Sequence, residues 1–205
     1  ELVPVGEPFK SGNIIESNSL VMARLVTEWG GAAFRLPIVR DEFEAIRDAV
    51  KEALETHDVV VLNAGSSAGS RDYTAAVVES VGELLVHGIA IRPGHPVVLG
   101  LAEGKPVIGI PGYPVSCVLT MELLVKPLVL RMLGVAGLPR PGITAAMTRK
   151  VFSALGQDEF LRVTVGNVGG RYVATPLTRG AGVMMSMVRA DGIVYVGLSA
   201  GEKEA

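Results

Sequence analysis

The chain has 205 residues, 49% of them hydrophobic, and a net charge of −2, which suits one large domain or a medium domain with a small one. This charge excludes a general electrostatic attraction to nucleic acid or to an anionic membrane, and no apolar run reaches the length of a membrane span. The single cysteine, Cys117, excludes internal disulfides, and no amino-terminal signal pattern is visible, so we expect a cytoplasmic protein. The three His and one Cys lack the spacing of metal ligands, which argues against a His/Cys metal centre.

Residues 1–136 alternate between helical and strand patterns. The clearest helix covers 40–57, where Phe43, Ile46, Val50 and Leu54 recur at helical spacing, and a continuous apolar strand follows at 58–63. Further helices are predicted at 16–31, 73–81 and 116–133. Further strands are predicted at 32–39, 84–86, 97–101 and 107–110. This order predicts an α/β domain built around a largely parallel sheet.

The pattern changes at 134–142, a stretch rich in Gly and Pro that is typical of a linker. Beyond it, alternating and β-branched segments are separated by Gly-rich turns. We therefore expect a small all-β domain with one short helical piece near 184–188. The resulting domain prediction is 1–136 for the α/β domain and 137–205 for the β domain.

A loop of small and polar residues follows the strand at 58–63. Ligands of open α/β sheets bind beyond the carboxyl ends of the strands, where small side chains and exposed N–H groups suit a phosphate. The residues that would serve this purpose are Gly65, Ser66, Ser67, Gly69 and Ser70. The loop is neither a Walker loop nor a GxGxxG motif, so a tight connection with glycines at positive φ remains an equal alternative.

Two aspartates stand where helices are predicted to start. Asp72 can hold a Mg²⁺ ion beside bound phosphates, because Mg²⁺ favours one or two carboxylates together with ligand oxygens. The commoner role of an aspartate at this position is a helix cap, which contributes about 1 kcal/mol. Asp41 presents the same choice, and Glu44 three residues later gives it the spacing of a capping box.

Two further turns could line a pocket. The PGYPVS segment at 111–116 follows an apolar strand, and its two prolines favour either a rigid pocket wall or an ordinary strand-to-helix turn. In IRPGHP, Arg92 and His95 bracket a Pro-Gly turn that includes Gly94. Arginine suits bidentate phosphate binding, although solvated surface arginines are commoner.

Together these segments resemble the molybdopterin molybdenumtransferase family of molybdenum cofactor biosynthesis. The resemblance covers nearly the whole chain, and its most specific part is PGYPVS placed after the Gly/Ser loop and Arg-Pro-Gly. The segments that carry it are ELVPVGEP, GNIIESN, IVRDE, DVVVLNAGSSAGSRDYT, HGIAIRPGHPVVLG, GKPVIGIPGYPVSCVLTMELLVKPLV and RADG.

The resemblance implies a three-layer molybdopterin-binding α/β fold followed by a small β-barrel-like domain. It also implies insertion of molybdate into adenylylated molybdopterin with release of AMP, assisted by Mg²⁺ or a similar divalent cation. The family's amino-terminal domains, which mediate homodimerisation, do not occur in this sequence. Contact with a molybdopterin adenylyltransferase is a further implied partnership.

The resemblance also implies roles for individual residues. Catalysis would fall to Asp72, Asp41 and Glu1, with Asp72 also holding the metal ion. The ligand-binding positions would be Gly65, Ser66, Ser67, Gly69, Ser70, Arg92, Gly94, Pro111, Gly112, Pro114, Ser116 and Arg162.

The sequence departs from the family pattern at several of these positions. Gly65-Ser66-Ser67-Ala68 replaces a common Gly-Gly-Val-Ser, and Arg92 stands where Lys is frequent. His95, Tyr113 and Ala181 replace a frequent Lys, Asn and Ser. Two alternatives stay open. One is an adenylyltransferase of the same fold, which SRDYT also resembles but which generally lacks the β domain. The other is a non-catalytic module that binds pterin or molybdate, which the altered Lys and Ser positions favour.

Overall fold

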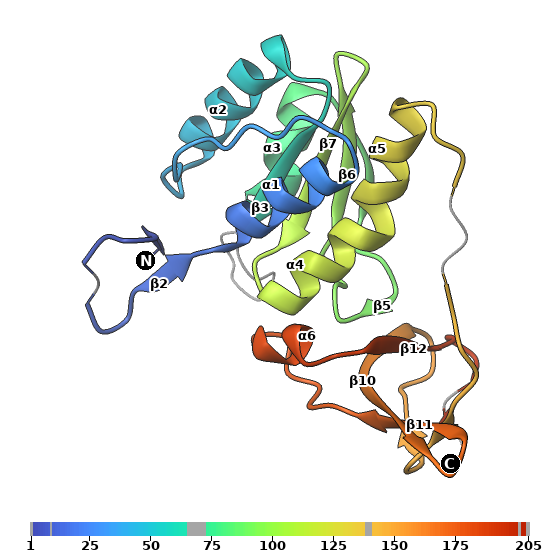
Figure 1. Cartoon of the computed structure of the whole chain (residues 1–205). Helices are drawn as coiled ribbons and strands as arrows, with labels where there is room; N and C mark the ends of the chain where they lie inside the picture. The colour runs from blue at the N-terminus through green and yellow to red at the C-terminus, as the bar shows by residue number, and fades with distance from the viewer. Residues whose placement is uncertain (1, 9, 65–72, 138–140, 201, 204–205) are drawn as a thin grey trace.

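The computed structural model describes residues 2–8, 10–64, 73–137, 141–200 and 202–203. An α/β unit lies above a smaller β unit in Figure 1, and a short amino-terminal arm projects from the α/β unit. In the described part of the chain, no helix combines the length and the apolar character needed to cross a membrane.

The α/β unit is organised around a four-stranded sheet with the strand order β3-β7-β6-β4. Its strands are β3 (Val60–Ala64), β4 (Glu83–His87), β6 (Val98–Ala102) and β7 (Lys105–Pro111). β3 and β7 pair in parallel, whereas the β7–β6 and β6–β4 pairs are antiparallel. The α/β class is confirmed, but the expectation of a largely parallel sheet holds only for β3 and β7.

The connection between β6 and β7 explains the mixed sheet. Glu103 and Gly104 link the two strands with φ values of 52° and 74°. A two-residue turn with both φ angles positive matches the right-handed twist of neighbouring strands, and it can join only antiparallel strands. The direction of β6 therefore follows from this turn.

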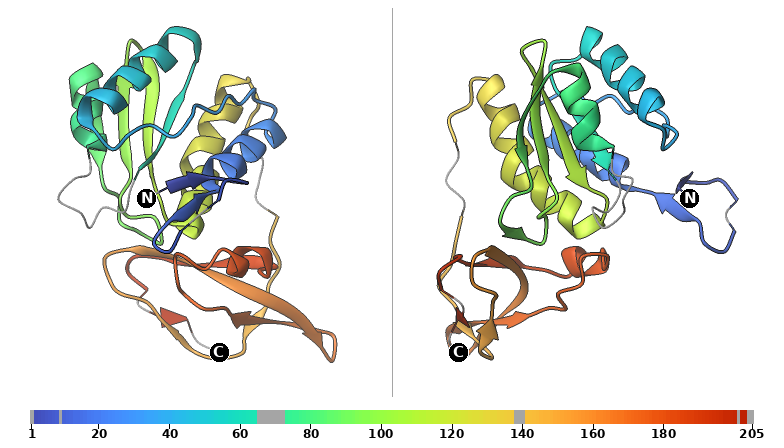
Figure 2. Two further views of the ribbon diagram at one scale, coloured as in Figure 1. Left: turned by 90° about the vertical axis from the view of Figure 1, so that its left-hand side faces the viewer. Right: turned by 180° about the vertical axis from the view of Figure 1, so that it is seen from behind.

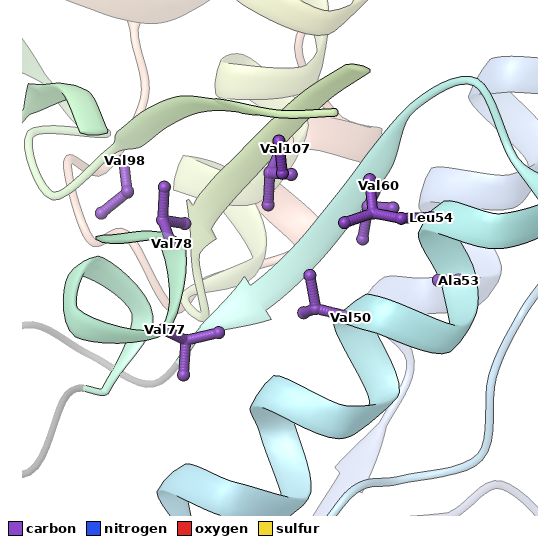
Figure 3. Packing of buried hydrophobic residues seen from close by; sticks show 9 residues of the cluster. Val50, Ala53, Leu54, Val60, Val77, Val78, Val98 and Val107 are labelled. Carbon is purple, nitrogen blue, oxygen red and sulfur yellow. The ribbon is translucent and has the colours of Figure 1, made fainter. Parts of the chain in front are cut away.

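Helices cover both faces of the sheet, which gives the predicted three layers (Figures 1 and 2). On one face lie α2 (Phe43–Thr56) and α3 (Thr74–Val81), which pack against the sheet through Val50, Leu54, Val77, Val78 and their neighbours (Figure 3). On the other face lie α1 (Asn18–Glu28), α4 (Pro114–Thr120) and α5 (Lys126–Met132). The apolar stripe predicted for 40–57 thus forms one of the two core faces.

The helix predicted at 116–133 begins earlier and is interrupted. α4 starts at Pro114, with Tyr113 as N-cap, because proline suits the first helical position. A π-helical turn, η1 (Met121–Val125), separates α4 from α5, and the N–H of Lys126 bonds to the carbonyl of Met121. The disturbance falls directly before Pro127, which lacks the N–H that an α-helix would use.

The strand predicted at 32–39 is wrong. These residues have no regular structure and are exposed, with Phe34 at 71%. β-branched and aromatic residues form a strand only where a neighbouring strand pairs with their backbone N–H and C=O groups. Pro37 has no N–H to donate to such a strand. Before this segment, β1 (Leu2–Pro4) and β2 (Ile14–Glu16) pair in parallel within the amino-terminal arm.

The β unit contains a five-stranded sheet with the order β12-β10-β11-β8, in which β5 also pairs with β10. The strands are β5 (Ile91–Arg92), β8 (Ala146–Met147), β10 (Asp158–Val168), β11 (Arg171–Pro176) and β12 (Gly192–Val196). A second pair consists of β9 (Val151–Phe152) and β13 (Glu202–Lys203). The β-rich carboxyl-terminal region is confirmed, as is its helical piece, α6 (Met185–Val188).

β5 is the notable exception in this arrangement, because it comes from the α/β part of the sequence. It pairs in parallel with the start of β10, and the Asp158 N–H donates to the Ala90 carbonyl at 2.8 Å. The two units are therefore joined by backbone hydrogen bonds as well as by the linker. A domain division after residue 136 stays a prediction.

Candidate functional site

The parallel strands β3 and β7 end side by side, with Ala64 opposite Pro111. Asn18, the first residue of α1, is 7% exposed and reaches both strand ends. Its Nδ2 donates to Asn63 Oδ1 at 3.2 Å and to the Gly112 carbonyl at 2.7 Å. One buried amide thus connects α1, the end of β3 and the loop after β7.

Glu16 holds the first turn of α1, the helix that Asn18 begins. Glu16 is 9% exposed, and its carboxylate accepts hydrogen bonds from the Ser19 N–H at 2.8 Å and the Ser19 hydroxyl at 2.5 Å. Arg35 lies alongside, with Nη2 3.7 Å from Glu16 Oε2 and Nε donating to the Ser19 hydroxyl. These contacts hold the start of α1 against the sheet edge.

Cys117 lies in α4 near this carboxylate and is 1% exposed. Burial, together with the charge of Glu16, raises the pKa of the Cys117 thiol to about 12. Since the thiolate is the nucleophilic form, Cys117 is a core residue and not a reactive group at neutral pH.

The 111–116 loop contributes backbone groups to the site. Pro111 is buried, the Gly112 carbonyl accepts from Asn18, and Pro114 begins α4. Ser116 is 4% exposed inside α4 and does not act as its N-cap. The N–H of Val115 donates to the Ala181 carbonyl of the β unit at 3.0 Å, so this loop also touches the second unit.

The turn after β5 packs tightly against α4. Arg92 and Pro93 are joined by a cis peptide bond, and Gly94 is buried with φ at +119°. A Cβ atom at Gly94 would lie 2.9 Å from Ile91 Cδ1 and 3.1 Å from Thr120 Oγ1, which explains the glycine. His95 Nδ1 lies 2.7 Å from the Ile89 carbonyl. A carbonyl only accepts hydrogen bonds, so Nδ1 is the protonated nitrogen and supports the turn.

A small cavity of about 10 Å³ lies between the two units. It is lined by Arg92, Pro93, Glu159, Phe160, Leu161, Arg162, Leu177 and Arg179. Its charged lining therefore consists of three arginines and one carboxylate, and its volume matches about one water molecule. We refer to it as the arginine cavity.

Two charged residues of the arginine cavity are buried and incompletely paired. Arg162 is 5% exposed, and its Nη2 donates to the carbonyls of Thr178 at 2.6 Å and Gly180 at 3.3 Å, while Nε has no hydrogen-bond partner. Burial lowers the pKa of the Arg162 guanidinium, which still stays protonated at neutral pH. Glu159 is 2% exposed, with Oε1 3.5 Å from Arg179 Nη1 and Oε2 without a hydrogen-bond partner.

The structure brings some of the predicted site residues together. Arg92 and Arg162 line the arginine cavity, and Gly94, which follows the cavity-lining Pro93, packs against Thr120 of α4. Asp41 is exposed ahead of α2, whose N-cap is Glu42 without a side-chain cap bond, so the predicted capping box does not form. The predictions at Glu1, Gly65, Ser66, Ser67, Gly69, Ser70 and Asp72 lie outside the described residues.

Sequence reasoning did not single out Asn18, Asn63, Glu159 or Arg179 as site residues. Asn18 looks like a helix cap, and Glu159 looks like an ordinary polar position in a strand. Within the described ranges, no three His, Cys, Asp or Glu side chains are grouped to hold a metal ion. The proposed Mg²⁺ ligand Asp72 falls outside those ranges.

Comparison with protein families matches both parts of the chain. Residues 1–131 match the family described as "Probable molybdopterin binding domain", and residues 144–202 match the "MoeA C-terminal region (domain IV)". A molybdopterin biosynthesis protein of Methanocaldococcus jannaschii is 33% identical over 186 residues, which is 90% of this chain and 44% of that one. The molybdopterin molybdenumtransferase of Haemophilus influenzae is 33% identical over 163 residues, which is 79% of this chain and 40% of that one.

Solved structures agree with these matches. The molybdopterin biosynthesis MoeA protein from Pyrococcus horikoshii has a TM-score of 0.82 and 37% identity, covering 100% of this chain and 49% of that one. A molybdenum cofactor biosynthesis protein from Pyrococcus furiosus has a TM-score of 0.73 and 26% identity, covering 92% and 61%. The chain spans less than half the length of the curated relatives it matches. By its two family matches and its fold, the chain belongs to the molybdopterin molybdenumtransferase family.

Proposed function

We propose that this chain is part of an enzyme that inserts molybdate into adenylylated molybdopterin and releases AMP. The observation that carries the proposal is the arginine cavity, to which the α/β part contributes Arg92 and the β part Arg162 and Arg179. Guanidinium groups bind oxyanions through paired N–H donors, so this cluster suits an anion once the units part enough to widen a cavity of about 10 Å³. The family matches support molybdate as the anion and molybdopterin as the pterin.

The remaining roles extend this proposal. The Gly/Ser loop would hold the phosphates of the pterin nucleotide, and Pro111, Gly112, Pro114 and Ser116 would form the neighbouring pocket wall. Asp72, Asp41 and Glu1 would be the catalytic carboxylates, with Asp72 holding Mg²⁺. We further propose that the division into 1–136 and 137–205 corresponds to two domains, that the whole protein is a cytoplasmic homodimer, and that it contacts a molybdopterin adenylyltransferase.

The test uses the full-length protein with adenylylated molybdopterin, molybdate and Mg²⁺, and follows AMP release. We expect release that depends on molybdate and that Asp72→Asn abolishes, with stability changed by no more than about 1 kcal/mol, the size of a lost cap. Asp58→Asn, at an exposed aspartate before β3, is the matched control and should leave turnover unchanged. Unchanged turnover in Asp72→Asn would reduce Asp72 to a helix cap.

The same assay separates the alternatives. Loading of molybdopterin with AMP from ATP would indicate an adenylyltransferase, although the match to the MoeA carboxyl-terminal region weighs against it. Tight pterin or molybdate binding without turnover would indicate a non-catalytic module. His95 and Ala181, which replace a frequent Lys and Ser, are the positions to restore first in that case.

A further inference from the structure

Asn18 joins the two chain segments that leave the carboxyl ends of β3 and β7. Its Nδ2 donates to Asn63 Oδ1 at 3.2 Å and to the Gly112 carbonyl at 2.7 Å, and we call these three residues the Asn18 clamp. The partners lie 45 and 94 residues away in the sequence, so both bonds act between segments and not within the helix that Asn18 begins. Ligands of α/β sheets bind at this edge of the sheet. Asn18 is therefore placed to set the spacing between two sides of a binding site.

Hydrogen-bond chemistry fixes which end of each amide faces its partner. A backbone carbonyl only accepts, so the Asn18 atom that faces Gly112 is Nδ2. The Asn63 atom that meets the same Nδ2 is an acceptor, its Oδ1. The donor end of Asn63 therefore points away from Asn18. Asn63 is half-buried at the end of β3, where this Nδ2 can donate to a ligand while its Oδ1 is held by α1.

The segments on both sides of the clamp are themselves held in place. Asn18 is 7% exposed and begins α1, whose first turn Glu16 holds through Ser19. On the other side, the Cys117 N–H donates to the Tyr113 carbonyl at 2.8 Å, which ties the loop after β7 to α4. The amide of Asn18 thus connects two fixed bodies, and its loss should change the spacing between them.

We propose that Asn18 is a positioning residue for the pterin nucleotide. It holds Asn63 and Gly112 at the spacing that this substrate requires, and it presents Asn63 Nδ2 to an acceptor oxygen of the substrate. The identity of the substrate rests on the proposed function. None of the three clamp residues is among the described lining residues of the arginine cavity, so the affinity for molybdate should not depend on the clamp. Small misplacements of binding groups are enough to weaken a reaction strongly, which makes the spacing measurable in kinetics.

The kinetic test measures AMP release by the full-length parent and by Asn18→Ala while each substrate is varied in turn. We expect KM for adenylylated molybdopterin to rise about tenfold, the fold-change that corresponds to about one lost hydrogen bond. KM for molybdate and kcat should stay within about twofold of the parent values, because a lost contact that is equal in the ground state and the transition state raises only the KM of its own substrate. An unchanged KM for adenylylated molybdopterin would overturn the proposal.

Leu54→Ala is the matched control for a general loss of stability. Leu54 is 2% exposed and packs with Val60 at the start of β3, the end of the strand opposite to Asn63. Truncation of a buried leucine destabilises a protein at least as much as the loss of one hydrogen bond. Both KM values of this control should stay near those of the parent. An equal rise in KM in Leu54→Ala and Asn18→Ala would show that only stability was lost, which contradicts a positioning role.

A double-mutant cycle tests whether Asn18 acts through Asn63. The effects of Asn18→Ala and Asn63→Ala on KM for adenylylated molybdopterin should not multiply when the two are combined, because the first substitution removes the group that orients Asn63. Effects that multiply in full would mean that the two residues act separately, against the proposal.

Hydrogen exchange of the full-length protein gives a readout that does not need turnover. In Asn18→Ala, exchange should become about tenfold faster in segments 60–64 and 111–117, which the clamp connects, and stay unchanged in 98–102 of β6. Equal exchange of parent and variant in the first two segments would also overturn the proposal.

Binding measurements separate this inference from the proposed function. If the parent releases no AMP, the proposed function fails, and calorimetric titration with adenylylated molybdopterin in the absence of molybdate decides about Asn18. Weaker binding by Asn18→Ala than by Leu54→Ala supports the positioning role, and equal or absent binding overturns it. Thermal unfolding checks that Asn18→Ala folds. If it does not, Asn63→Ala alone serves, with an expected rise in KM of about threefold because it removes one of the two bonds.

Discussion

At the scale of single residues, Asn18 has the most demanding position in the described site. Its amide is the only group shown to bond both strand ends, through Asn63 and Gly112, among the residues that the structure describes. An isosteric carboxylate could accept but not donate, so it could not satisfy the Gly112 carbonyl. The position therefore needs an amide rather than any polar side chain.

We expect Asn18→Asp to lower the free energy of unfolding by about 1–3 kcal/mol, the cost of leaving a buried acceptor unpaired beside a new charge. Urea denaturation measures this as a lower midpoint with an unchanged slope. Asn167→Asp makes the same charge change where the side chain only accepts, from the Gly170 N–H, and should shift stability by no more than about 0.5 kcal/mol. Equal effects of the two substitutions would contradict the bridging role.

Cys117 predicts a pH dependence of stability. The thiol pKa is about 12 in the folded protein and near its ordinary value of 9 in the unfolded chain, so the unfolded state loses the proton first as pH rises. The free energy of unfolding should therefore fall between these two pH values, by up to about 1.4 kcal/mol per pH unit from this group. Chemical denaturation gives the free energy of unfolding of the parent and of Cys117→Ala across that pH window. The difference between the two curves isolates Cys117, since the other groups titrate in both proteins. Parallel curves would show that Cys117 contributes nothing.

At the scale of elements, close backbone packing decides which strands meet. A Cβ atom on Gly100 of β6 would lie 2.2 Å from Val78 Cγ1 in α3 and 2.7 Å from the Glu83 carbonyl of β4. Gly109 of β7 is similarly crowded, 2.4 Å from Thr74 Cγ2. These glycines let α3 lie directly on the sheet, which brings its buried valines into the core shown in Figure 3.

Gly100→Ala should destabilise the protein by about 1–3 kcal/mol, because a methyl group there requires the backbone of β4 or the helix α3 to shift. Gly166→Ala in β10 is the control, since its nearest neighbour would be Val173 Cγ2 at 3.7 Å, an ordinary contact. Thermal and urea unfolding of both variants compare the two sites. A loss confined to Gly166→Ala would refute the packing argument.

At the scale of the whole molecule, backbone hydrogen bonds tie the two units together. β5 pairs with β10, and the Val115 N–H bonds to the Ala181 carbonyl. Val115 lies in the first turn of α4, where backbone N–H groups have no partner within the helix. The β unit thus accepts a hydrogen bond from the Val115 N–H, which has no partner within α4. The arginine cavity lies along this junction.

Hydrogen exchange can test this junction. We expect the amides of Val115 and Asp158 to exchange within about tenfold of the Ile108 amide in the core strand β7, because both bonds would break only when the units separate. NMR or mass spectrometry of the folded chain measures these rates. Exchange as fast as that of Thr144, an exposed residue just after the linker, would mean that the units move independently.

The local sequence determined much of the fold, because periodicity and turn chemistry act within a few residues. The apolar stripe of α2, the apolar strand β3 and the proline-bounded start of α4 follow from neighbours in the chain. The same local information predicted a strand at 32–39, which failed because a strand also needs a partner from elsewhere.

The site depended on contacts that no local pattern contains. Asn18 meets residues 45 and 94 positions away, and β5 leaves its own unit to pair with β10. Arg92, Glu159, Arg162 and Arg179 surround one cavity although they come from both units. The residue types and motifs of this protein could be read from its sequence, whereas burial, unpaired atoms and the meeting of charges arose only when distant segments packed together.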